Sequence, residues 1–203
     1  MKNVITNDLI EKAYTYPQYK ELVAGLIEQK KTTGNTQSEK YIAFTKLNSE
    51  RVKRIEKTTV IEDDVRNVFE RVEKELIFLV IAEAWCGDVA QNLPVIDLLA
   101  KLNPKIDLRI ILRDENDEVM KHFLTNGGKA IPVCLIINKS DLSVLGKWGP
   151  RPVPPQSIMR EHKNNPVESY DETGKKIQLW YAKDKGKTLG AELSALLKSF
   201  MLD

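Results

Sequence analysis

Hydrophobic residues before position 75 recur at three- and four-residue steps, which is typical of amphipathic helices. The pattern predicts a broken pair of helices over about residues 9–27, interrupted at Pro17, because proline removes a backbone donor from a helix. Further helices are predicted over about residues 37–57 and 62–73, and the second opens on acidic residues suited to a helix N-terminus. The chain therefore begins with a helical segment.

From Leu76 onward the hydrophobic pattern changes to one of alternating strands and helices. An unbroken apolar run predicts a buried strand, whereas an apolar–polar alternation predicts a strand with one buried face. The predicted elements are, in order, a strand at 76–83, a helix at about 88–102 kinked at Pro94, a strand at 106–112, a short helix capped by Asp114, and strands at 133–137 and 142–145. This order predicts an α/β fold with parallel strands that ends in an antiparallel hairpin.

The C-terminal part of the chain begins with a stiff, proline-rich connector at residues 149–155. A helix at about 155–163 follows it, then a polar, turn-rich stretch at 164–176, and a last amphipathic helix lies within 187–202. We expect one domain in three parts. These parts are an N-terminal helical extension at 1–60 packed on the core, the core itself at 61–165, and a C-terminal helical extension at 166–203.

The composition narrows the class of protein. Hydrophobic residues make up 42% of the 203 residues and charged residues 30%, with a net charge of only +2, which gives no case for nucleic acid as the main partner. No apolar run is long enough to cross a membrane, and the first residues lack a signal-peptide pattern, so we expect a cytoplasmic protein. The two cysteines match neither a disulfide framework nor a zinc-ligand spacing, and we expect no metal or other cofactor.

The basic stretch from Arg51 to Arg54 is predicted to lie on a solvated helix face.

Candidate chemistry concentrates at the sequence Trp85-Cys86-Gly87-Asp88, between the first buried strand and the helix that follows it. At a helix start, backbone N–H groups and the helix dipole stabilise a thiolate. Asp88 opposes this effect, because a neighbouring negative charge raises the pKa of a thiol. Position 89 is valine, so the second cysteine of a C-x-x-C motif is missing.

The order of elements from residue 70 to 163 resembles the thioredoxin fold, a central mixed sheet flanked by helices. Trp85-Cys86-Gly87 resembles the active-site turn of that family, Pro94 stands where its helix-kinking proline stands, and Ile131-Pro132 occupies the place of its cis-proline loop. The motif with Asp88 and the extra N-terminal helices is also similar to a bacterial group of uncharacterised thioredoxin-like proteins.

This resemblance implies thiol–disulfide chemistry in which Cys86 attacks a disulfide as a thiolate. Val89 cannot resolve the resulting mixed disulfide, and Val80 stands where the family keeps a buried carboxylate. We therefore expect a single-cysteine oxidoreductase acting on a protein or small-molecule disulfide, with an external thiol such as glutathione resolving the intermediate. Some single-cysteine relatives in the glutaredoxin group bind an iron–sulfur cluster, but Trp85 follows the thioredoxin pattern instead.

Two alternatives compete with this hypothesis. Cys86 can be an idle residue at an exposed helix start, or the protein can be an adaptor that holds an extended peptide in the groove of Trp85, Cys86 and the Ile131-Pro132 loop without redox chemistry. Cys134 is a candidate resolving thiol, but its apolar neighbours favour a role in core packing.

Overall fold

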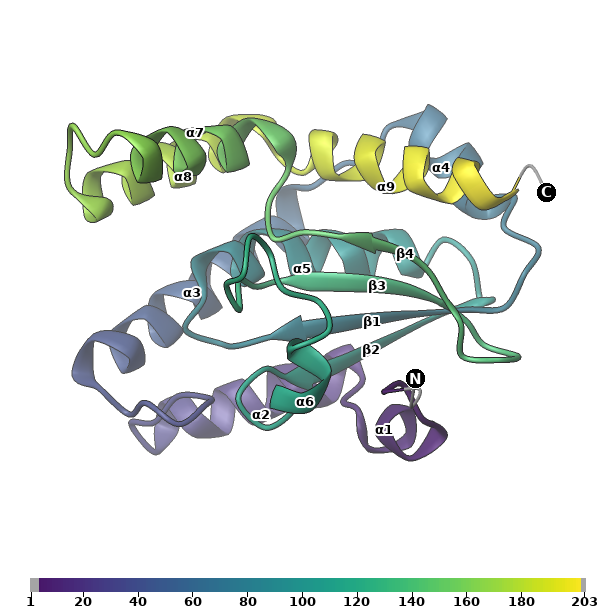
Figure 1. Ribbon diagram of the computed structural model, residues 1–203, viewed down its shortest axis with the longest axis horizontal. Coiled ribbons are helices and arrows are strands. Elements are labelled where there is room, and N and C mark those ends of the chain that lie inside the picture. Colours follow the sequence, from purple (N-terminus) through teal and green to yellow (C-terminus); the bar gives the residue numbers. More distant parts are fainter. Residues whose placement is uncertain (1–3, 202–203) are drawn as a thin grey trace.

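The computed structural model describes residues 4–201, and its four-stranded sheet has the order β2-β1-β3-β4 (Figure 1). Strand β1 (Leu76–Ala82) pairs in parallel with β2 (Ile106–Leu112), while β3 (Val133–Asn138) runs antiparallel to β1 and β4 (Val144–Trp148). Every residue of β1 is buried, which explains its unbroken apolar sequence. The α/β class and the thioredoxin-like arrangement predicted from the sequence are confirmed.

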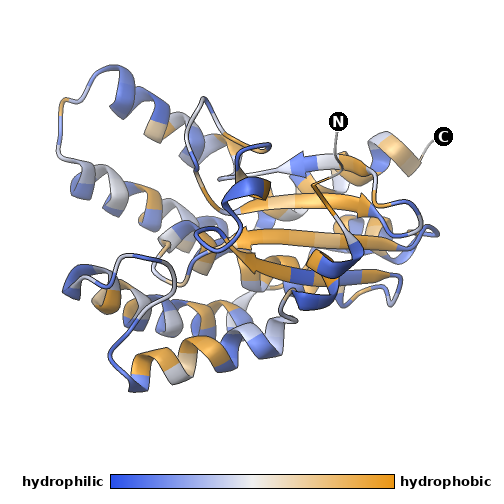
Figure 2. Cartoon of the chain, turned by 60° about the horizontal axis from the view of Figure 1, so that its bottom comes forward, coloured by the Kyte–Doolittle hydropathy of each residue, from blue (hydrophilic) through white to orange (hydrophobic). Residues whose placement is uncertain are grey.

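Nine helices surround this sheet within the described residues. They are α1 (Asn7–Lys12), α2 (Tyr16–Glu28), α3 (Glu39–Thr58), α4 (Asp63–Glu70), α5 (Gly87–Ala100), α6 (Asp117–Met120), α7 (Val153–Asn164), α8 (Tyr170–Asp184) and α9 (Lys187–Met201). Helix α5 packs on β1 and β2, and α3, α4 and α9 pack around α5. Figure 2 shows the apolar residues concentrated on the strands and on the inward sides of these helices.

One main hydrophobic core includes side chains from both ends of the chain. Ile5 and Tyr16 from the N-terminal segment and Leu193 and Leu197 from α9 belong to the same cluster as the β1 residues. The division of the chain at residues 60 and 165 stays a prediction.

The predicted break near Pro17 is present, and its cause is local. Thr15 caps α2 through a reciprocal pair of hydrogen bonds with Gln18, and Pro17 lies in the first turn, where a helix does not use the backbone N–H. The structure therefore places Pro17 at the start of a helix after a gap that follows α1.

Three of the predicted elements differ from the structure. The stretch 164–176 contains the start of α8, because Ser169 and Glu172 form a capping box and Thr173 and Ile177 are buried. Strand β4 begins at Val144 and not at 142. Asp114 does not cap α6, which begins three residues later without a side-chain cap.

Asp114 instead joins a group that fixes the carboxyl ends of β1 and β2. Its backbone N–H donates to Oε1 of the fully buried Glu83 at 2.9 Å, and its carboxylate accepts from the Asn35 N–H at 3.0 Å. The Ala84 N–H donates to Thr33 Oγ1 at 2.8 Å. The loop before α3 is thereby tied to the strand end that leads into the Trp85-Cys86 turn.

We predict that Gly149→Ala lowers the free energy of unfolding by about 3–5 kcal/mol. Gly149 has φ +118°, and a Cβ there would lie 2.3 Å from the carbonyl oxygen of Pro132. Gly127→Ala is the matched control, because Gly127 has φ +77° but no atom within 4 Å of a Cβ, so only about 1–2 kcal/mol of backbone strain is expected. Equal losses for the two variants in urea denaturation would contradict the close approach to Pro132.

We also predict that Glu83→Gln stabilises the protein by about 1 kcal/mol at pH 8. Burial raises the pKa of Glu83 although hydrogen bonds from Thr33 and the Asp114 N–H act to lower it, and its Oε2 has no hydrogen-bond partner in the part of the chain that the structure describes. The folded state of the wild type therefore loses stability as the pH rises from the ordinary carboxyl pKa through the raised value, whereas glutamine loses nothing. Urea denaturation at pH 4 and pH 8 should show the gain mainly at pH 8, with the exposed Glu73→Gln as a control that changes little. A loss of stability at pH 8 would refute this account.

Candidate functional site

Cys86 occupies the N-cap position of α5, immediately after β1, as the sequence indicated. The residue is only 8% exposed, and its Sγ donates a hydrogen bond to the Ile131 carbonyl oxygen at 3.4 Å. The Ile131–Pro132 peptide bond is cis. The turn and the proline loop, which lie 45 residues apart in the sequence, therefore meet at the sulfur atom.

The surroundings of Cys86 keep its thiol protonated in this conformation. Burial, and after it the charge of Asp88, raise the pKa of Cys86 to about 12, although the backbone N–H groups of Val89 and Asp88 and the charge of Arg151 act in the opposite direction. Burial has the largest effect, so the pKa of Cys86 is raised even though the N-terminus of α5 acts to lower it. The thiol therefore carries the features that stabilise a thiolate, but it is shielded from the solvent that a thiolate needs.

Asp88 is buried and is held by contacts from outside its own helix. Arg151 forms an ion pair with its carboxylate at 2.6 Å, and the Tyr181 hydroxyl donates to the same group at 3.0 Å. Asn92 Nδ2 donates both to the Tyr181 hydroxyl at 2.9 Å and to the Asp88 carbonyl at 2.8 Å. Burial raises the pKa of Asp88, and the ion pair with Arg151 opposes this.

Trp85 forms one wall of the site and is half-buried. Its ring stacks on Tyr41 of α3 with 4.6 Å between centroids and 14° between planes, and the guanidinium of Arg113 lies 4.9 Å from its centroid. The indole is thus sandwiched between an aromatic ring and a cation. Trp85 is therefore partly used to pack the turn, and part of its surface stays accessible.

Side chains from α3 and α8 cover the first turn of α5. A Cβ at Gly87 would lie 3.1 Å from Gln178 Nε2 and 3.3 Å from the Arg51 guanidinium, and Gln91 Nε2 donates to Gln178 Oε1 at 2.7 Å. The prediction that Arg51 lies on a solvated face is wrong, because this side chain is half-buried over Gly87 and donates to Asn48 at 2.9 Å.

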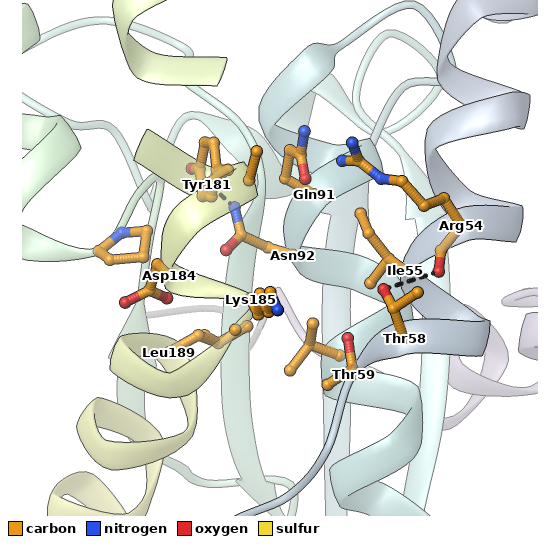
Figure 3. A pocket seen from close by; sticks show the side chains of 14 residues that line it. Arg54, Ile55, Thr58, Thr59, Gln91, Asn92, Tyr181, Asp184, Lys185 and Leu189 are labelled. Atoms are coloured by element: carbon orange, nitrogen blue, oxygen red, sulfur yellow. Dashed lines mark hydrogen bonds between the residues drawn. The ribbon is translucent and has the colours of Figure 1, made fainter. Parts of the chain in front are cut away.

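The hairpin of α7 and α8 carries a small apolar cluster of its own, formed by Met159, Ile177 and Tyr181. At its hinge, Lys185 and Gly186 have positive φ angles of 56° and 84°. A cavity of about 200 Å³ lies beside this hinge, between α3, α5 and the start of α9, and Figure 3 shows Asn92 and Tyr181 joined on one of its walls. Polar contacts join this hairpin to α5, namely Gln178 with Gln91 and Tyr181 with Asp88 and Asn92.

Cys134 does not complete the site. It lies on β3 and is fully buried. Its partner across the sheet is Val80 of β1, which precedes Cys86 by six positions in the sequence. Both cysteines are free, and burial alone raises the pKa of Cys134 to about 12. Its environment is that of a core residue.

Sequence reasoning located Trp85, Cys86, Gly87, Asp88 and the Ile131-Pro132 loop, and the structure brings these residues together. It missed the side chains that cover them, namely Tyr41, Arg51, Arg113, Arg151, Gln178 and Tyr181. No pattern in the sequence marks these side chains, because each comes from a part of the chain distant from the turn that it covers.

Two features are absent from residues 4–201. No group of three or more His, Cys, Asp or Glu side chains is placed to hold a metal ion. No helix in that range is long and apolar enough to cross a membrane.

Comparison with known proteins agrees with the fold. Among solved structures, a protein of unknown function, PA1234 from Pseudomonas aeruginosa, is similar over 92% of this chain and 98% of its own, with 18% identity and a TM-score of 0.56. An HIV 4E10 epitope-scaffold is similar over 92% of this chain and 99% of its own, with 19% identity and a TM-score of 0.56. The curated proteins gave no match. A family model, Thioredoxin_9, described as Thioredoxin, matches residues 34–177, which is more than half of the chain. The chain therefore belongs to this thioredoxin family.

Proposed function

We propose that this protein is a single-cysteine thiol–disulfide oxidoreductase in which Cys86 is the nucleophile. The observation that carries the proposal is the position of its sulfur. It lies at the N-terminus of α5, where the backbone N–H groups of Asp88 and Val89 act to lower its pKa, and it is 3.4 Å from the carbonyl oxygen that precedes the cis proline. These donors favour the thiolate wherever burial does not outweigh them.

The reaction proceeds in two exchanges. The Cys86 thiolate attacks one sulfur of a substrate disulfide, the S–S bond breaks, and the other sulfur leaves as a thiolate. Because Val89 offers no resolving thiol and Cys134 is buried in the sheet, an external thiol such as glutathione attacks the mixed disulfide at the substrate sulfur. That step releases Cys86 as a thiolate and joins the external thiol to the substrate in a new disulfide, so electrons balance without a metal or other cofactor.

We infer that the sulfur becomes accessible when the α7–α8 hairpin moves, because side chains of α8 cover the residues next to Cys86. Gln178 and Tyr181 of α8 contact the first two turns of α5, and Arg151 precedes α7. Rotation about hinges near Pro152 and Gly186 would remove Gln178 and Tyr181 of α8 together. Because burial is the largest cause of the raised Cys86 pKa, opening would lower that pKa while leaving the backbone donors in place.

A second candidate function is binding without redox chemistry, the alternative set out from the sequence. The burial of Cys86 favours it, since the closed conformation presents a protonated thiol. In that case Trp85 and the Ile131-Pro132 loop would hold a peptide after the hairpin opens, because the Ile131 carbonyl is already occupied by the Cys86 thiol when it is closed.

The two functions predict different behaviour with oxidised glutathione. For the oxidoreductase, we expect a glutathione adduct at Cys86 that excess dithiothreitol removes, and alkylation by iodoacetamide that accelerates about tenfold for each pH unit between pH 7 and 10, since only the thiolate reacts. Mass spectrometry locates the adduct, and Cys86→Ser is the control. No adduct after prolonged incubation, with no alkylation of the folded protein, would exclude thiol chemistry and leave binding as the function.

A second test uses the charge beside the sulfur. Asp88→Asn is expected to speed alkylation of Cys86 at pH 8 by about tenfold or more, because it removes a negative charge that raises the thiol pKa and weakens the contact that holds the hairpin closed. The matched control is Asp97→Asn, which changes another carboxylate of α5 that pairs with Lys101. An unchanged rate in Asp88→Asn, with the fold intact by circular dichroism, would show that this carboxylate does not control the thiol.

A further inference from the structure

A second cavity, of about 250 Å³, lies between α2 and α3, with the start of α5 as its floor. Tyr16, Tyr19, Val23 and Val52 contribute two aromatic rings and two aliphatic side chains to its walls, and Val89 forms part of the floor. A cavity of about 150 Å³ lined by apolar side chains is large enough to bind benzene. This cavity therefore has room for a molecule larger than a single ring, and Cys86 is not among the residues that line it.

The Tyr19 hydroxyl is an unused polar group in this cavity. Tyr19 is 6% exposed, and no hydrogen bond of its hydroxyl is present within the described residues. A buried hydroxyl normally has a partner. Among residues 4–201, the side-chain atoms that are both enclosed and unpaired are Glu83 Oε2, Thr125 Oγ1, Arg151 Nε and Ser194 Oγ. The Tyr19 hydroxyl is not one of these atoms, and its side chain lines the cavity, so we take this hydroxyl as the polar group available to a ligand there.

The charged groups at the rim are already paired with one another. Lys20 binds Glu56 at 2.8 Å, and the Tyr16 hydroxyl donates to the same carboxylate at 2.9 Å. Lys53 binds Glu50 at 2.7 Å. A charged ligand would have to displace one of these partners, whereas a neutral ligand leaves them unchanged.

We propose that this cavity binds a small neutral aromatic molecule of about two fused rings carrying one hydroxyl group, which hydrogen-bonds to Tyr19. The tyrosine rings supply aromatic contacts, the aliphatic walls supply apolar burial, and the unpartnered hydroxyl selects for one polar group on the ligand. This site goes beyond the proposed redox function and does not depend on Cys86.

The test uses 2-naphthol as the probe, titrated at pH 7 up to about 1 mM, the affinity range expected for a molecule of this size. Chemical shifts of backbone amides in ¹H–¹⁵N spectra report binding and its place. We expect saturable shifts in α2, α3 and the start of α5. Tyr19→Phe keeps the ring and removes the hydroxyl, so it should weaken binding by about threefold to tenfold. Cys86→Ser should bind as tightly as the wild type, which separates this site from the thiol chemistry.

Two variants fill the cavity from different helices, Ala24→Phe from α2 and Ser49→Phe from α3. Either one that remains folded should abolish saturable binding. The proposal is overturned if 2-naphthol causes no saturable shifts in the wild type, or if both filled variants bind as the wild type does. Tighter binding of naphthalene-2-sulfonate than of 2-naphthol would also overturn it, because the site would then select a negative charge.

Discussion

The buried ion pair between Asp88 and Arg151 joins the parts of the molecule that form the candidate site. Asp88 belongs to the first turn of α5, whereas Arg151 precedes α7, and Tyr181 adds a hydrogen bond from α8. Removal of one partner from a buried pair leaves an uncompensated charge and typically costs about 3–5 kcal/mol. The same contact places a negative charge beside Cys86 and a cation near it, so the attachment of the hairpin and the electrostatics of the thiol depend on one pair of residues.

The sheet and the turn at its end were predictable because their signals are local. The two-residue alternation at 106–112 corresponds to β2 without a shift, and the apolar run from Leu76 corresponds to β1. The start of α8 was missed because its first turns are mostly polar and only Thr173 and Ile177 face inward. In that segment, the capping box of Ser169 and Glu172 was the sequence signal that identifies a helix start.

The residues of the candidate site also divide into those with a local sequence signal and those without one. The Trp85-Cys86-Gly87-Asp88 turn was evident from a strand, a motif and a helix that are contiguous in the sequence. The residues that cover it are far away along the chain; Tyr181, for example, follows Asp88 by 93 positions. Such contacts leave no periodic pattern, and a basic residue that will be buried by a distant helix looks the same as one on a solvated face, as Arg51 did. The sequence also placed Val80 where the family has a buried carboxylate, and gave no indication that Glu83, three residues later, is fully buried.

The separate apolar cluster of the α7–α8 hairpin has a consequence for how the molecule fluctuates. Met159, Ile177 and Tyr181 pack mainly with each other and with two neighbouring side chains, apart from the main core. Segments with few buried contacts to the rest of a protein open as cooperative units at free energies below that of global unfolding. The amide hydrogens of α7 and α8 should therefore exchange with solvent through a partial opening that leaves the sheet intact, while those of β1 and β3 exchange only when the whole molecule unfolds. Native-state fluctuations would then expose the sulfur far more often than the overall stability suggests.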